Sequence, residues 1–224
     1  MVDASEKRPR KWKITALIFA FILPGTILLV LARLFLFETF DVPSESNVPS
    51  LMPGDMFIAN KLAYHFGGHP ARGDIAVFKY PKDLRVRYVK RVIGLPGDRV
   101  QLRMGRLYLN GDLIQRVAVD NVQVPADLNT PQLQFYRETL PSGRSYIIAE
   151  INDTMSTDNT EEFLVPPGHY FVLGDSRDNS QDSRFLENVG YVPEENFIGA
   201  YFRRYGNKRG FTLLGRPEEI YPQK

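Results

Sequence analysis

The sequence contains no cysteine and only three histidines, His65, His69 and His169. Without cysteine, a thiol nucleophile, a disulfide and a thiolate metal site are all excluded. His65 and His69 lie four positions apart, but residues 65–70 (HFGGHP) cannot form one helical face that presents both to a metal. No histidine is singled out by a neighbouring acid as a member of a Ser-His-Asp triad. There is also no Gly-rich phosphate loop, and we expect neither a metal nor a cofactor.

A net basic charge is present at the N-terminus but not in the rest of the chain. The formal net charge is +2, and residues 1–13 alone hold five basic side chains against two acidic ones. The rest of the chain therefore has no basic surplus that would attract a phosphate backbone, and we expect no nucleic-acid partner. A composition with 43% apolar and 24% charged residues is typical of a folded chain, and one extramembrane domain is expected.

A long apolar run lies near the N-terminus. Residues 14–32 carry no charged side chain, and about twenty helical residues cross the hydrocarbon core of a bilayer. We therefore predict a transmembrane helix over residues 14–37, which tolerates Pro24-Gly25 in mid-span and lets Arg33 reach the interface. The alternative is a cleaved secretory signal, but the run is longer than an ordinary signal core and residues 38–41 do not form a small-x-small cleavage site.

The position of the basic residues predicts the orientation. Because the basic cluster precedes the apolar run, the positive-inside rule places residues 1–13 in the cytoplasm and residues 38–224 across the membrane. The sequence thus predicts a single-pass protein of the cytoplasmic (inner) membrane, with a cytoplasmic basic tail and an extracytoplasmic domain on the periplasmic side.

The remaining chain is predicted to be mainly β, as a barrel or a folded sheet. Short apolar runs alternate with Gly, Pro, Asn and Asp, and no amphipathic helical window is found beyond the apolar run. Asn110-Gly111 is the strongest hairpin signal and is predicted to join residues 106–109 to 113–115. Residues 120–165 show the weakest pattern and are expected to form an insertion or a long hairpin. The predicted strands are 56–59, 75–78, 87–93, 99–102, 107–109, 146–149, 170–173 and 197–202.

Residues 43–51 (PSESNVPSL) follow the apolar run and place two serines, Ser44 and Ser46, between two prolines. Proline restricts the backbone, so the segment can point a hydroxyl in a set direction and leave N–H groups free to stabilise an oxyanion. The alternative is a Pro-Ser-rich linker between anchor and domain.

Residues 87–98 (RYVKRVIGLPGD) contain a lysine within a predicted strand. Strand alternation places Lys90 on one face with Tyr88 and Val92, and Arg91 on the other. Burial disfavours a charged amine and lowers its pKa from about 10.4, to as low as ~5–6 when burial is complete. Lys90 is thereby a candidate general base. The alternative is a basic stripe on a solvated strand.

Residues 174–184 (GDSRDNSQDSR) follow the predicted strand 170–173 and alternate Asp with Arg twice. Guanidinium forks that pair with carboxylates would make this segment a rigid, crosslinked loop. An exposed polar turn and a cation-binding loop are the alternatives.

In this order, the segments resemble the bacterial type I signal peptidase (leader peptidase) family. The resemblance also includes residues 73–78 (GDIAVF) and extends from the apolar run to about Gly199. It implies a membrane-bound serine endopeptidase that removes signal peptides from exported pre-proteins by acyl transfer with a Ser-Lys dyad. It also implies a β-rich catalytic core with a smaller inserted β region over about residues 103–165.

The resemblance assigns roles residue by residue. Ser46 is the nucleophile and Lys90 the general base, neutral in the resting enzyme. Ser44 supplies an oxyanion-hole hydroxyl alongside the backbone N–H of Ser46, and Ser180 orients the Lys90 amine. The residues that hold the site's scaffold are Asp175, Arg177, Asp182 and Arg184.

The resemblance also implies partners. Substrates are pre-proteins with small residues at the first and third positions before the cut, and they lie extended against an edge strand. The other implied partners are the lipid bilayer and, transiently, the secretion translocon.

Asn47 departs from the family, in which methionine usually follows the nucleophile. Two further hypotheses are a conjugation-type peptidase that matures one pilin or relaxosome protein, and a catalytically silent membrane-tethered module that binds signal peptides.

Overall fold

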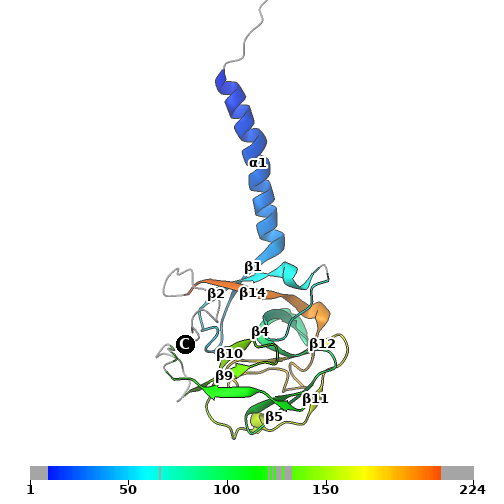
Figure 1. Cartoon of the computed structure of the whole chain (residues 1–224). Helices are drawn as coiled ribbons and strands as arrows, with labels where there is room; N and C mark the ends of the chain where they lie inside the picture. Colours follow the sequence, from blue (N-terminus) through cyan, green and yellow to red (C-terminus); the bar gives the residue numbers. More distant parts are fainter. Residues whose placement is uncertain are drawn as a thin grey trace, which may run out of the picture.

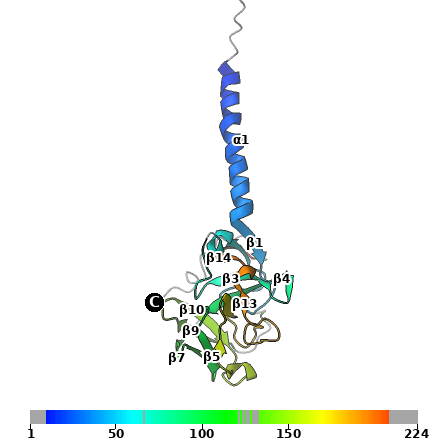
Figure 2. The same ribbon diagram turned by 90° about the vertical axis from the view of Figure 1, so that its right-hand side faces the viewer.

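The computed structural model describes residues 10–65, 67–120, 122, 124, 128 and 133–207. It shows a long helix, α1 (Arg10–Leu36), that stands away from a β-rich body (Figures 1 and 2). Most of the predicted basic tail, residues 1–9, lies outside the described residues. The predicted mainly-β body is confirmed.

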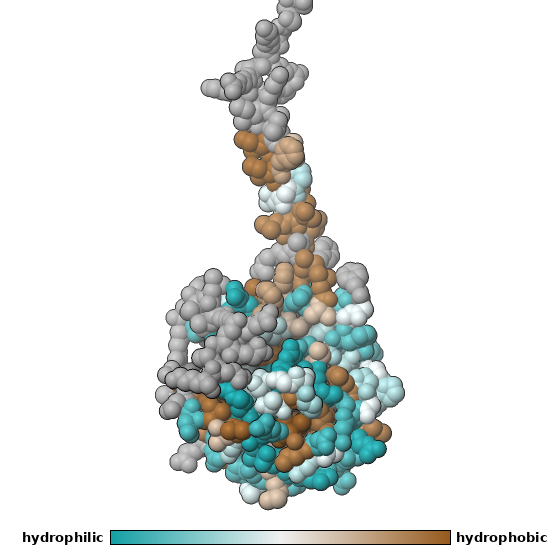
Figure 3. Space-filling model, viewed as in Figure 1, coloured by the Kyte–Doolittle hydropathy of each residue, from teal (hydrophilic) through white to brown (hydrophobic). Residues whose placement is uncertain are grey.

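Helix α1 has 27 residues and contains Pro24. Its side chains from Ile18 to Leu31 are exposed, and Figure 3 shows much of this surface as hydrophobic. Across the residues with a described placement, no helix combines the length and the apolar content that crossing a membrane requires. The predicted transmembrane helix is therefore not confirmed.

A seven-stranded antiparallel sheet forms the half of the body next to α1, in the order β1-β2-β14-β3-β4-β12-β13. Helix α1 passes into β1 with no residue between them. The strands of this sheet are β1 (Phe37–Asp41), β2 (Met56–Asn60), β3 (Ile75–Tyr80), β4 (Asp83–Gly94), β12 (His169–Leu173), β13 (Val192–Pro193) and β14 (Phe197–Gly206).

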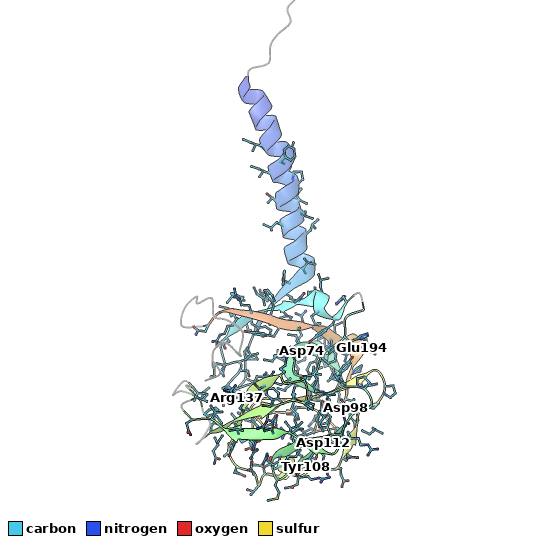
Figure 4. All side chains as sticks on the ribbon, in the orientation of Figure 1. Asp74, Asp98, Tyr108, Asp112, Arg137 and Glu194 are labelled. Carbon is cyan, nitrogen blue, oxygen red and sulfur yellow. The ribbon has the colours of Figure 1, made fainter. Side chains whose placement is uncertain are left out.

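Two smaller sheets form the other half, and their strands all lie between Arg99 and Leu164. Figure 4 labels Asp98, Tyr108 and Asp112 in this half, and Asp74 and Glu194 in the half that holds the large sheet. One sheet contains β10 (Ser145–Glu150), β9 (Gln134–Thr139) and β8 (Gln115–Ala118), and the other contains β11 (Phe163–Leu164), β5 (Arg99–Arg103), β6 (Arg106–Leu109) and β7 (Asp112–Leu113). The 3-10 turns of the described residues are η1 (Lys61–Tyr64), η2 (Ser156–Asp158) and η3 (Glu194–Asn196).

Strand alternation divides the core between the two faces of the large sheet. On β4, Val92 joins one buried cluster and Ile93 another; on β12, Val172 and Phe171 divide in the same way. Because successive side chains of a strand point to opposite faces, continuous apolar runs fit strands that are buried on both sides. Strand β4 is therefore packed on both faces at Val92 and Ile93, directly after Lys90 and Arg91.

The predicted hairpin at Asn110-Gly111 is present, but its second strand is shorter than expected. Both turn residues have positive φ, 55° and 89°, as a two-residue hairpin turn with glycine in second place favours. Strand β7 ends at Leu113, and β8 begins a different sheet at Gln115. Between them Ile114 is buried, which turns the chain into the core and away from the hairpin.

Candidate active site

The first component of the site is the segment 44–50, a turn between β1 and β2. Backbone hydrogen bonds from Val48 N to Glu45 O (3.1 Å) and from Leu51 N to Asn47 O (2.9 Å) close it. This local bonding leaves the Ser46 side chain pointing into the body, where the residue is 7% exposed. Ser44 is exposed, and its Oγ lies 3.2 Å from Ser46 Oγ.

The second component is Lys90 on β4, which is 5% exposed. Its Nζ lies 2.6 Å from Ser46 Oγ, so two residues 44 positions apart in the chain share a hydrogen bond. Pairing with Ala76 of β3 fixes the backbone at Lys90, and the amine lies 5.7 Å from the centroid of the Tyr88 ring. The structure thus brings together the two side chains that the sequence had singled out.

The environment of the Lys90 amine disfavours its charge. Burial lowers the pKa of Lys90 from 10.5 to about 8, although the negative charges of Asp182 and Asp175 partly oppose this effect. The positive charge of Arg184 lowers the pKa further. Among the ion pairs of the described residues, none includes Lys90. A buried amine that faces a hydroxyl is poised to exchange a proton with it.

Arg91, the next residue on β4, turns to the opposite face and is 2% exposed. Its guanidinium donates two hydrogen bonds to the Asp175 carboxylate, at 2.7 and 2.6 Å. It also donates to Gly73 O (2.7 Å) and to Ser50 Oγ (3.1 Å). Arg91 therefore links the 174–184 loop, the start of β3 and the segment that carries Ser46.

The predicted crosslinks of the 174–184 loop are present, but two of them leave the loop. Arg184 donates to Asp182 at 2.9 and 3.0 Å within it, whereas Arg177 pairs with Glu138 on β9, at 2.9 and 2.5 Å. Burial raises the pKa of Asp182, but the pairing with Arg184 and the hydrogen bonds from Gly174 N and Ser180 together hold the pKa below its usual value. Glu138 is 1% exposed and was missed in the sequence, because the vague region 120–165 gave no strand there.

Ser180 lies near the site without bonding to the amine. Its Oγ is buried and makes no hydrogen bond of regular geometry, but the hydroxyl lies close enough to the Asp182 carboxylate to help lower the pKa of that group. A Cβ added to Gly174 would lie 2.1 Å from Ser180 Oγ and 2.4 Å from Ser46 O, so glycine is needed for this loop to approach the segment that carries Ser46. Ser176 N donates to Ser46 O at 3.2 Å across that contact. The role of Ser180 in orienting Lys90 stays a prediction.

A serine hydroxyl against a buried amine is an arrangement that suits hydrolytic chemistry, and the comparisons with known proteins point the same way. A family model described as "Signal peptidase, peptidase S26" matches residues 14–205. The chain belongs to this family of peptidases.

Curated relatives define the type of peptidase. Signal peptidase I of Rickettsia canadensis is 37% identical over 221 residues, which cover 88% of this chain and 79% of the relative. Signal peptidase I of Pseudomonas aeruginosa is 36% identical over 198 residues, which cover 80% of this chain and 68% of the relative. The chain is thus an enzyme, a peptidase of the signal peptidase I type.

A solved structure is also similar in sequence. The crystal structure of a signal peptidase I from Enterococcus faecalis is 31% identical and covers 58% of this chain and 95% of its own. Its TM-score of 0.35 is too low to compare the two folds.

Proposed function

We propose that the chain is a serine endopeptidase that removes signal peptides from exported pre-proteins, with Ser46 as nucleophile and Lys90 as general base. The observation that carries the proposal is the 2.6 Å contact between Lys90 Nζ and Ser46 Oγ at a buried position. Family membership supports the substrate, since the relatives of this family are signal peptidases. No cofactor is part of the proposal.

The reaction is acyl transfer. Neutral Lys90 takes the Ser46 proton as the alkoxide attacks the scissile carbonyl, and the resulting ammonium protonates the leaving amine. Water then hydrolyses the acyl-enzyme, with Lys90 again as base. With a pKa of about 8, roughly one amine in ten is neutral at pH 7, against roughly one in a few thousand for a solvated lysine.

Two donors are available for the oxyanion. Ser44 Oγ lies 3.2 Å from Ser46 Oγ, and Ser44 is exposed. Among the hydrogen bonds of the described residues, none uses the backbone N–H of Ser46, so this group is available to a ligand. Removing one such donor typically lowers turnover by about 10²–10³.

The proposal includes a membrane anchor. Residues 14–32 carry no charge. The side chains of α1 from Ile18 to Leu31 are exposed and mostly apolar, and the helix leads into β1, which the Ser46 segment follows (Figure 1). We infer a cytoplasmic tail over residues 1–13, an anchor over 14–37 and an extracytoplasmic catalytic domain over 38–224, with residues 103–165 as its inserted β region. Signal peptides in the same bilayer, near the translocon, would then reach Ser46.

The full chain in detergent micelles, incubated with a purified pre-protein, tests the proposal by mass spectrometry of the products. Wild type is expected to cut once, after a small residue, whereas Ser46→Ala and Lys90→Met each lower the rate by about 10³-fold or more. Thermal unfolding of each variant checks that the fold is intact. Cleavage at the wild-type rate by either variant would disprove the dyad, and binding without cleavage by wild type would indicate a silent module.

A further inference from the structure

The side chain of Asn47 takes no part in the proposed reaction, yet it is 3% exposed and makes a specific contact. Its Nδ2 donates to Val89 O at 2.8 Å, across 42 positions of the chain. Asn47 follows Ser46, and Val89 precedes Lys90. A single side-chain hydrogen bond therefore joins the two backbone segments that carry the nucleophile and the base.

Val89 O lies on the β12 edge of β4, just before the residues with which β12 pairs in the described structure. Val92 pairs with the β3 side of the sheet, donating to Asp74 O (2.8 Å) and accepting from Gly73 N (2.7 Å). Since backbone groups of a strand alternate between its two edges, the carbonyl of Val89 points to the other edge. On that edge, β12 pairs with β4 at Arg91 and the residues after it, but not at Val89. The side-chain amide of Asn47 therefore donates to Val89 O, as the backbone N–H of a neighbouring strand would.

We propose that Asn47 is a positioning residue, which sets the Ser46–Lys90 contact by fastening the nucleophile segment to the β12 edge of β4. This inference rests on the proposed function of the dyad. The segment is also attached from Ser176 N to Ser46 O (3.2 Å), from Arg91 Nη2 to Ser50 Oγ (3.1 Å) and from Asn179 Nδ2 to Glu45 Oε2 (3.2 Å). These bonds are longer than the bond of Asn47, so the segment remains folded without Asn47 but is less closely held beside Lys90.

The test compares two substitutions at Asn47 with a matched control. Asn47→Leu removes the donor at similar volume, and Asn47→Gln keeps an amide. Asn196 provides the control, because it is 7% exposed and its Nδ2 donates to a strand carbonyl, Lys79 O, at 3.3 Å, but on β3 and not on β4. The measurements are kcat and KM for one pre-protein, with thermal unfolding to confirm that each variant is folded.

Asn47→Leu is expected to lower kcat by about 10–100-fold with KM within about twofold of wild type, because misplacement by about 1 Å costs on this order. Asn47→Gln should recover most of the lost kcat, and Asn196→Leu should keep the wild-type kcat. Wild-type kcat in Asn47→Leu, a change confined to KM, or an equal loss in Asn196→Leu would each overturn the inference. Those results leave the dyad untouched, whereas activity in Ser46→Ala would overturn the proposed function itself.

Discussion

Two neighbouring residues of β4, Lys90 and Arg91, are both basic and buried, but only Arg91 is paired with a carboxylate. Both are almost fully buried, at 5% and 2% exposure, and they face opposite sides of the sheet. Arg91 meets the Asp175 carboxylate with two hydrogen bonds, whereas Lys90 meets a neutral hydroxyl. Burial with a carboxylate partner preserves the charge of Arg91, whereas burial without one lowers the pKa of the Lys90 amine, as the proposed general base requires.

A third cation on the same strand completes the comparison. Arg85 also pairs with a carboxylate, that of Asp83, but its side chain is 90% exposed. Exposed ion pairs contribute little to stability. Besides the half-exposed pair of Arg87 and Glu38, strand β4 thus carries a solvated pair, a buried amine without an ion pair and a buried pair. Substitutions at these last three sites separate the three cases.

The largest effect on stability is expected at the buried pair. Asp175→Asn leaves the guanidinium of Arg91 buried without its counter-charge, which should lower the free energy of unfolding by about 3–5 kcal/mol. Urea unfolding measures the change. The double variant Asp175→Leu/Arg91→Met should lose clearly less than Asp175→Asn, since no charge then remains buried; an equal or greater loss would contradict this account.

Lys90→Met should instead stabilise the fold, by about 1–3 kcal/mol at pH 7, while it removes activity. The pKa of Lys90 is about 8 when folded and 10.5 when exposed, so the unfolded state binds more protons between these pH values and wild-type stability rises across them. The advantage of the variant is therefore greatest below pH 8 and declines toward pH 10.5.

Urea unfolding of wild type and of Lys90→Met at several pH values measures this difference. A constant difference from pH 7 to pH 10.5 would show that the amine keeps its ordinary pKa, and the contrast with Arg91 would be lost.

The smallest effect is expected at the exposed pair. Arg85→Ala should leave the midpoint of thermal unfolding and the cleavage rate unchanged, because Asp83 and Arg85 remain solvated without each other. Differential scanning calorimetry checks the midpoint. A clear fall in the midpoint of Arg85→Ala would mean that the contribution of a basic residue of β4 to stability depends on its position along the strand and not on its burial.

Local patterns predicted much of the fold and of the candidate site. Turn residues and apolar runs place all eight predicted strands within strands of the structure, and alternation separates Lys90 from Arg91 correctly. The proximity of Ser46 and Lys90 came from resemblance, because no local pattern relates residues 44 positions apart. The membrane span and the roles of the site residues stay predictions.

Long-range pairing is what the sequence could not provide. The Asp/Arg alternation of the 174–184 loop indicated crosslinks, but only Asp182 and Arg184 pair within the loop. Asp175 and Arg177 pair with residues on β4 and β9, whose approach is decided by tertiary packing. Strand β9 itself was missed, since its polar sequence, with Glu138 inside, contradicts the apolar signal of a buried strand.

The direct passage of α1 into β1 has a mechanical consequence for the proposed anchor. No residue intervenes to act as a hinge, so a change in the tilt of the helix is transmitted to the large sheet. The five extended residues of β1 cover about 17 Å at ~3.3 Å per residue, and the Ser46 turn follows them. In the proposed membrane-anchored enzyme, the junction would therefore fix the distance between the bilayer and Ser46, and with it the distance from the bilayer at which a substrate is cut.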